Sequence, residues 1–168
     1  MKKTFLLMTL MLFALMGRAQ SVSVFITDND RYTNVRNSPN GKVVARIDNN
    51  LGSGMLELEK PVNGWWRIED DSWEIAEEAK EVTLRGSRTG YWIHYSVVGF
   101  GTRNYGGQKL TLRATPSVKG RAVYSFTKEL ILHPLEVKGE WIKVKTNDGH
   151  IGWIHEEWIC DNPLTNCC

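Results

Sequence analysis

The sequence predicts an all-β fold of two small barrels in tandem, and strand patterning, turn signals and an internal repeat are the observations that predict it. Short runs of β-branched and aromatic residues, such as 43–47, 110–113 and 141–146, are separated by Gly, Asn and Pro. Asn147-Asp148-Gly149 is a strong hairpin turn signal between 141–146 and 151–154. Strands this short, in units of about seventy residues, favour small barrels.

Three sequence blocks recur in the same order. Asn34-Val35-Arg36-Asn37-Ser38-Pro39 is matched by Thr111-Leu112-Arg113-Ala114-Thr115-Pro116, Gly64-Trp65-Trp66-Arg67-Ile68 by Glu140-Trp141-Ile142-Lys143-Val144, and Trp92-Ile93-His94 by Trp153-Ile154-His155. The spacing recurs too, because Arg36 lies 29 residues before Trp65 and Arg113 lies 28 before Trp141. We therefore expect one module at 20–100 and a second at 108–160, joined by a glycine-rich linker at 101–107.

The two copies differ in one interval. Trp65 and Trp92 are 27 residues apart, whereas Trp141 and Trp153 are 12 apart. The extra residues predict an insertion at about 69–84 in the first module. Residues 70–80 fill most of this interval and are expected to form a short acidic helix, since Asp71 followed three positions later by Glu74 resembles a capping box.

The N-terminus has the three-part layout of a secretory signal peptide. Lys2 and Lys3 precede a twelve-residue apolar stretch at 5–16, and Gly17-Arg18-Ala19 supplies small residues at the cleavage site. The apolar stretch is too short to span a bilayer as a helix. We expect residues 1–19 to be removed between Ala19 and Gln20, which places the protein in the periplasm or outside the cell and not across the membrane. A buried N-terminal helix is the alternative, and it explains this order of residues less well.

The charge balance argues against a nucleic-acid partner. Without residues 1–19 the chain has 18 basic and 19 acidic side chains, a net charge of −1, whereas nucleic-acid-binding proteins normally have a basic excess. The sequence also lacks a phosphate-binding glycine loop, and we expect no cofactor.

Strand alternation sorts the aromatic residues into two faces. In the run that begins at Trp141, Ile142 and Val144 share the face that should point into the core. Trp141 then points to the other side. The same alternation directs Trp66 inward in the first copy and leaves Trp65 outside, so Trp65 and Trp141 are the expected partly exposed aromatics.

The second copy resembles the bacterial Src-homology-3-like family, the SH3b modules. The motifs that carry this resemblance are 112–116, Gly139-Glu140-Trp141-Ile142-Lys143-Val144 and Gly152-Trp153-Ile154-His155, and they span about 108–159. The first copy matches at its start and at both Trp blocks but departs at the insertion. The resemblance implies strongly bent barrels of five or six strands, no catalysis, and binding of cell-wall peptides by many members.

A further resemblance concerns the segment 152–159, which is similar to the closing segment of eukaryotic Src-homology-3 domains. It implies that Ile154 and Ile159 are core residues and that Trp158 joins Trp141 in a shallow groove. Val97 occupies the matching position in the first copy. The candidate ligand-binding residues are Trp141, Trp158, Trp153, Glu156 and Trp65. Glu156 and Glu157 could accept an ammonium group, although aromatics of small barrels are often structural and these glutamates could form a solvated turn.

The C-terminal cysteines allow three interpretations. A disulfide is the default in an exported chain, and Cys160 paired with Cys167 would close a turn in the tail 161–168. A zinc site lacks paired C-x-x-C spacing, and a Cys nucleophile would need a positioned histidine. A bond between the adjacent Cys167 and Cys168 would be strained. We expect the Cys160–Cys167 disulfide and no metal.

These expectations together predict an exported, non-catalytic binding module that recognises peptidoglycan or another cell-envelope peptide through aromatic grooves. The alternative is a structural or adaptor protein whose modules contact another envelope protein or each other. A hydrolase is the third class, and we expect no enzyme activity.

Overall fold

The computed structural model describes residues 20–51, 55–69 and 90–162, and this part of the chain is all-β. Its strands pair in antiparallel sheets, and its short helical turns are all of the 3-10 type. The expected signal peptide at 1–19, nearly all of the expected helical insertion and the tail from 163 onward lie outside the described residues. Within the described residues, no helix has the length and apolar character needed to cross a bilayer.

Residues 20–99, here the N-terminal half, contain a seven-stranded sheet in the order β3-β2-β6-β5-β4-β1-β7. Its strands are β1 (Val22–Ile26), β2 (Tyr32–Arg36), β3 (Val43–Asp48), β4 (Met55–Val62), β5 (Trp65–Ile68), β6 (Tyr91–His94) and β7 (Val98–Gly99). The 3-10 turns are η1 (Asn49–Leu51) and η2 (Tyr95–Val97).

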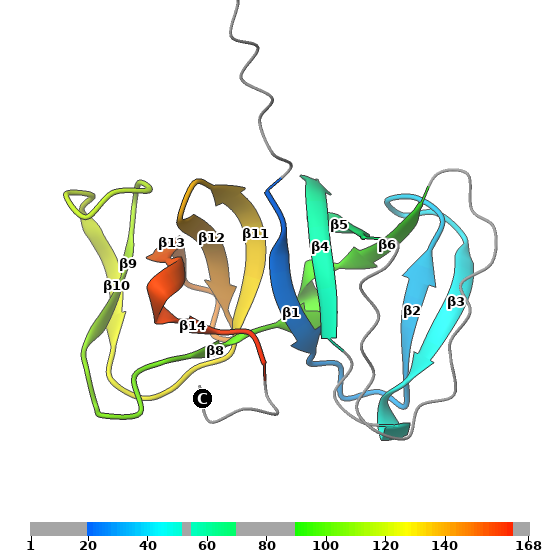
Figure 1. Ribbon diagram of the computed structural model, residues 1–168, viewed down its shortest axis with the longest axis horizontal. Helices are drawn as coiled ribbons and strands as arrows, with labels where there is room; N and C mark the ends of the chain where they lie inside the picture. The colour runs from blue at the N-terminus through cyan, green and yellow to red at the C-terminus, as the bar shows by residue number, and fades with distance from the viewer. Residues whose placement is uncertain (1–19, 52–54, 70–89, 163–168) are drawn as a thin grey trace, which may run out of the picture.

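Residues 100–162, the C-terminal half, contain a five-stranded sheet in the order β10-β9-β13-β12-β11 and a two-stranded sheet of β14 and β8. The strands are β8 (Gly101–Thr102), β9 (Leu110–Arg113), β10 (Ala122–Phe126), β11 (Leu132–Lys138), β12 (Trp141–Thr146), β13 (Ile151–His155) and β14 (Ile159–Cys160). The 3-10 turn η3 (Glu156–Trp158) connects β13 to β14. The halves lie side by side in Figure 1.

The sequence repeat is also a repeat of strand order. The order β3-β2-β6-β5-β4 in one half corresponds to β10-β9-β13-β12-β11 in the other. The register agrees as well, because Arg36 is opposite Trp92 and Arg113 is opposite Trp153. The pairing of β1 with β7 corresponds to the pairing of β8 with β14.

The arginine of the first repeated block holds a hairpin closed. Arg36 Nη1 donates to the carbonyl oxygen of Gly41 at 2.6 Å, and Arg113 Nη1 donates to that of Gly120 at 2.9 Å. Each arginine sits on the strand before a long turn and satisfies a backbone oxygen within it. The recurrence of this arginine therefore has a structural cause.

The two halves share one continuous core. The Trp66 side chain is fully buried, and its indole N–H donates to the carbonyl oxygen of Pro134 in β11 at 2.9 Å. Phe100, the first residue of the C-terminal half, is also fully buried, and it exchanges two backbone hydrogen bonds of 2.9 and 3.1 Å with the buried Leu132 of the same half. A buried indole N–H and a buried carbonyl oxygen both need a hydrogen-bond partner. Here the N-terminal half supplies the donor and the C-terminal half supplies the acceptor.

A histidine and a glycine complete this junction. His133 Nδ1 donates to the carbonyl oxygen of Val98 at 2.7 Å, and its other ring nitrogen lies 2.7 Å from Asn147 Oδ1. A Cβ at Gly99 would lie 2.8 Å from the carbonyl oxygen of Leu132, which is closer than real Cβ contacts. Glycine therefore allows the chain to pass from one half to the other at close range.

The segment expected as a linker, 101–107, is part of the fold. Gly101 and Thr102 form β8, which pairs with β14, and Thr102 and Asn104 are buried. The glycines suggested a link between modules, but Asn104 Nδ2 donates to the carbonyl oxygen of Thr127 at 2.9 Å. Residues 101–104 therefore pair with residues of the C-terminal half.

The predicted strand faces are right for the aliphatic residues and for Trp66. Ile142 and Val144 are buried, as is Ile154. Trp65 requires a correction, because it was expected to be partly exposed and is only 9% exposed. The guanidinium carbon of Arg36 lies 5.5 Å from the centre of the Trp65 ring and covers it. Strand alternation predicts only that Trp65 points away from the core, and not which side chain covers it there.

We expect Trp66→Phe to lower the free energy of unfolding by about 1–3 kcal/mol, because it leaves the Pro134 carbonyl buried without its donor. The whole chain should still unfold in one transition, measured by urea titration. Trp65→Phe makes the same change on the preceding residue of β5 and should cost less. Equal losses in the two variants would contradict the role assigned to the indole N–H.

Candidate functional site

A groove with aromatic walls lies on the C-terminal half, and we call it the aromatic groove. It has a volume of about 220 Å³ and contains both Trp141 and Trp158. It is lined by Lys109, Leu110, Thr111, Arg113, Val118, Trp141, Ile154, His155, Glu157 and Trp158. The structure thus brings together the two tryptophans that the sequence placed in one groove.

His155 connects the two walls of the aromatic groove. Its ring lies edge-on to Trp141, with centroids 5.2 Å apart and an interplanar angle of 88°. Its Nδ1 accepts the backbone N–H of Glu157 at 3.4 Å and so caps η3, the turn that carries Trp158. The neutral ring then carries its proton on Nε2, which lies 3.3 Å from Glu140 Oε2.

Sequence reasoning did not select His155 for the site, although a signal was present. His94 holds the same position in the repeat, caps η2 and lies 5.0 Å from the Trp65 ring. A histidine that recurs opposite a recurring tryptophan indicates a fixed pair. Burial and the nearby Lys145 ammonium lower the pKa of His94, which favours its neutral, capping form.

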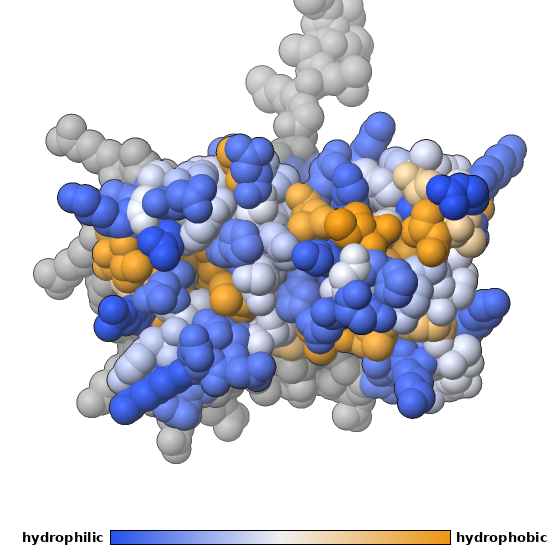
Figure 2. All heavy atoms as spheres, turned by 180° about the vertical axis from the view of Figure 1, so that it is seen from behind, coloured by the Kyte–Doolittle hydropathy of each residue, from blue (hydrophilic) through white to orange (hydrophobic). Residues whose placement is uncertain are grey.

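The groove is built from strand ends and one hairpin. Trp141 begins β12 and Trp158 ends η3, while Val118 comes from the hairpin that Arg113 holds closed. Figure 2 shows hydrophobic surface patches divided by hydrophilic side chains. Among the large hydrophobic residues that the structure describes as exposed, only Val118 lines this groove.

The other predicted site residues lie elsewhere. Trp153 is 7% exposed and does not line the groove, and the Lys143 ammonium lies 6.0 Å from its ring centre. Glu156 points into a neighbouring cleft rather than the aromatic groove. Trp65 is buried in the N-terminal half.

That neighbouring cleft, here the junction cleft, lies between the halves and has a volume of about 490 Å³. It is lined by Ser21, Val22, Ser23, Glu57, Arg103, Ile142, His155, Glu156, Glu157, Ile159 and Asp161. Burial raises the pKa of Glu57, a hydrogen bond from Ser21 opposes this, and the negative charges of Asp161 and Glu69 raise it further. The hydroxyl of Ser23 also donates to Glu57.

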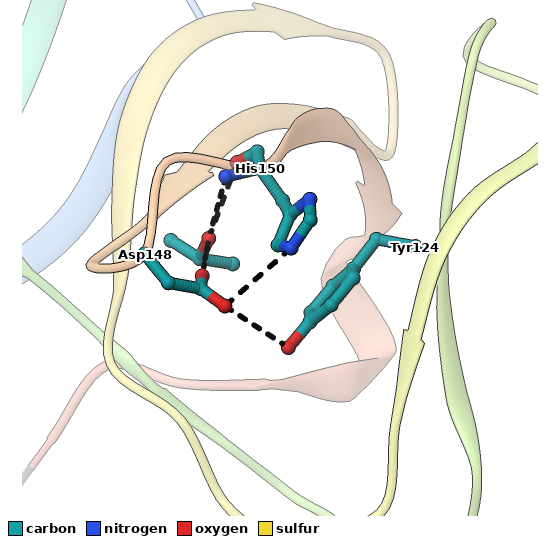
Figure 3. Close-up of polar contacts among 4 residues, drawn as sticks. Tyr124, Asp148 and His150 are labelled. Carbon is teal, nitrogen blue, oxygen red and sulfur yellow. Dashed lines mark hydrogen bonds and ion pairs between the residues drawn. The ribbon is translucent and has the colours of Figure 1, made fainter.

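A third polar group, Tyr124, Asp148 and His150, is structural (Figure 3). The rings of Tyr124 and His150 stack with centroids 3.8 Å apart, and the Tyr124 hydroxyl donates to Asp148 at 3.4 Å. Phe126 stacks on Tyr124 at 5.8 Å. These contacts tie the turn between β12 and β13 to β10. The hydrogen bond from the Thr146 hydroxyl lowers the pKa of Asp148.

Cys160 is fully buried and disulfide-bonded. Its predicted partner, Cys167, lies outside the described residues, so the pairing stays a prediction. Among the described residues, no group of three or more His, Cys, Asp or Glu side chains could hold a metal ion.

Comparison with known families matches residues 109–159 to the bacterial SH3 domain. Comparison with curated proteins gave no match. Among solved structures, the chain is similar to NlpC1 from Trichomonas vaginalis, with 12% identity and a TM-score of 0.32 over 85% of this chain and 46% of that one. NlpC2 from the same organism gives 11% identity and a TM-score of 0.32, with coverages of 84% and 48%. The chain spans about half the length of these two structures.

We expect Asp148→Asn to lower the melting temperature by roughly a few degrees at pH 7. The folded pKa of Asp148 is lowered, so its ionised form stabilises the fold above the unfolded pKa, and this contribution is lost as pH falls through the folded pKa. The difference in melting temperature between Asp148→Asn and the wild type should therefore shrink below about pH 4. The exposed residue Glu129 offers a control, Glu129→Gln. A difference in melting temperature that stays constant from pH 7 to pH 2.5 would contradict the stabilising role assigned to the ionised Asp148.

For the cysteines, we expect mass measurement of the exported chain without reductant to reveal one intramolecular disulfide, and peptide mapping to join Cys160 to Cys167. Three free thiols, or stoichiometric zinc in elemental analysis, would refute this pairing.

Proposed function

Because residues 109–159 are a bacterial SH3 domain, we propose that this chain is an exported, non-catalytic module that binds a cell-envelope peptide, specifically a peptide of peptidoglycan. The observation that carries the proposal is the presence of Trp141 and Trp158 in one groove within the matched segment. The signal-peptide layout of residues 1–19 supports export.

The size and lining of the aromatic groove favour weak, selective binding. Two indole rings and the exposed Val118 offer apolar contact, while Lys109 and Glu157 offer one charge of each sign for the ends of a peptide. At roughly 25 cal/mol per Å², burying a few hundred Å² contributes several kcal/mol before the ligand's lost freedom is subtracted. We expect dissociation constants on the order of tens to hundreds of micromolar.

The repeated strand order supports two barrels in tandem. We propose that the second barrel binds the ligand. In the N-terminal half, Val97 replaces Trp158 and packs against the core, and Trp65 is buried where Trp141 is half-buried. That half therefore offers no matching aromatic pair for a ligand.

One observation favours the alternative, a structural role, for the N-terminal half. Its η2 turn packs against β11, and the Lys145 ammonium donates to the Tyr95 hydroxyl at 3.3 Å. The surface that corresponds to the ligand side of the C-terminal half thus contacts the other half. We infer that the N-terminal module supports the second one.

The state of Cys160 supports a non-catalytic role. A cysteine nucleophile must present a thiolate to its substrate, and Cys160 is fully buried and disulfide-bonded.

The proposal is tested by sedimenting the chain without residues 1–19 with isolated peptidoglycan sacculi. We expect retention of the wild type, and a dissociation constant at least about tenfold higher for Trp141→Ala and Trp158→Ala, because buried aromatic contacts dominate small interfaces. Tyr105 is 63% exposed and lies outside both the groove and the cleft, so Tyr105→Ala is the matched control and should bind normally.

Absence of retention, or equal retention of all three variants, would shift the assignment to the structural role. Mass spectrometry of the supernatant checks for hydrolysis. Released muropeptides would show that the chain is an enzyme.

A further inference from the structure

The junction cleft adjoins the aromatic groove, and the two share a wall. His155 and Glu157 line both, and η3 lies between them. Trp158 is on the groove side of this turn, and Glu156 is on the cleft side. A peptide that leaves the groove over η3 therefore enters the cleft.

The cleft has an apolar lining and an uneven charge. Val22, Ile142 and Ile159 supply aliphatic surface. Its charged side chains are Glu57, Glu156, Glu157 and Asp161 on the acidic side and Arg103 on the basic side, together with His155. Even with Arg103 and a protonated His155, the carboxylates are in excess. The cleft is thus complementary to a positively charged group.

Glu57 comes from the N-terminal half, on β4, and it is held in the cleft against its own preference for water. Burial and the nearby carboxylates raise its pKa, so its ionised form costs stability in the free protein. An ammonium group in the cleft would offset that cost. Sites that recognise charge commonly retain such groups although they lower stability.

We propose that the junction cleft receives a primary ammonium group of the same envelope peptide whose apolar part lies in the aromatic groove, which makes the site a composite of both halves. This inference rests on the function proposed above. It adds a ligand chemistry, a free amine next to an apolar segment, and it gives the N-terminal half a direct contact with the ligand through Glu57.

The test combines a change in the ligand with a change in the cleft. Sacculi are used as isolated and after acetylation with acetic anhydride, which converts free amines to neutral amides. The chain without residues 1–19 is compared with the double variant Glu57→Gln/Glu156→Gln, with Glu129→Gln as an exposed control outside the cleft. Both cleft substitutions keep side-chain size and remove the negative charge.

We expect acetylation to weaken wild-type and Glu129→Gln binding about tenfold or more, which is the range for loss of a charge-assisted contact. The double variant should bind native sacculi about as weakly as the wild type binds acetylated sacculi, and acetylation should weaken it little further. Its melting temperature at pH 7 should equal or exceed that of the wild type, because a costly buried charge is removed.

Wild-type binding that is insensitive to acetylation would overturn the cleft proposal while leaving the proposed function in place. An equal loss on acetylation in the wild type and the double variant would also overturn it, since the amine would then be recognised elsewhere. Failure of the wild type to bind native sacculi would instead refute the proposed function, and the cleft proposal with it.

Discussion

The hydrogen bond from the buried Trp66 indole to the Pro134 carbonyl is the contact on which the architecture depends. It joins the sheets of the two halves, and separate units of such a size are only marginally stable. Phe100, Leu132 and His133, which take part in the same junction, are buried as well. With each half supplying partners that the other needs, the halves become one cooperative unit, and the junction cleft exists because they are held together.

The two copies of one strand order have acquired different surroundings at equivalent positions. After the capping histidine, the first copy continues with Tyr95, which contacts Lys145 across the junction. The second copy continues with Glu156, which faces the junction cleft. The same 3-10 turn therefore presents an aromatic ring to a protein neighbour in one half and a carboxylate to solvent in the other. Under the proposed function, divergence at this position separates a supporting half from a ligand-binding one.

Local patterns were sufficient to predict the strands, the repeat and the core face of β12, because side chains alternate along any strand. The resemblance also brought Trp141 and Trp158 into one groove. Alternation does not tell what covers the outer face, so the burial of Trp65 under Arg36 was missed. The glycines of 101–107 suggested a linker, although Gly101 and Thr102 form β8, which pairs with β14, and Asn104 is buried. The junction cleft could not be predicted, since it depends on how two modules pack together.

A rigid junction also changes what a shallow groove can achieve. A small barrel has little surface with which to hold an extended peptide, and each contact made by a mobile loop costs ordering entropy on binding. Here Glu57 is fixed on a strand of one half, and His155 fixes η3 on the other. The separation between the apolar walls and the acidic cleft is therefore set before the ligand arrives. In the proposed composite site, the N-terminal half contacts the ligand at only one carboxylate, and it then contributes to selectivity mainly by holding that carboxylate still.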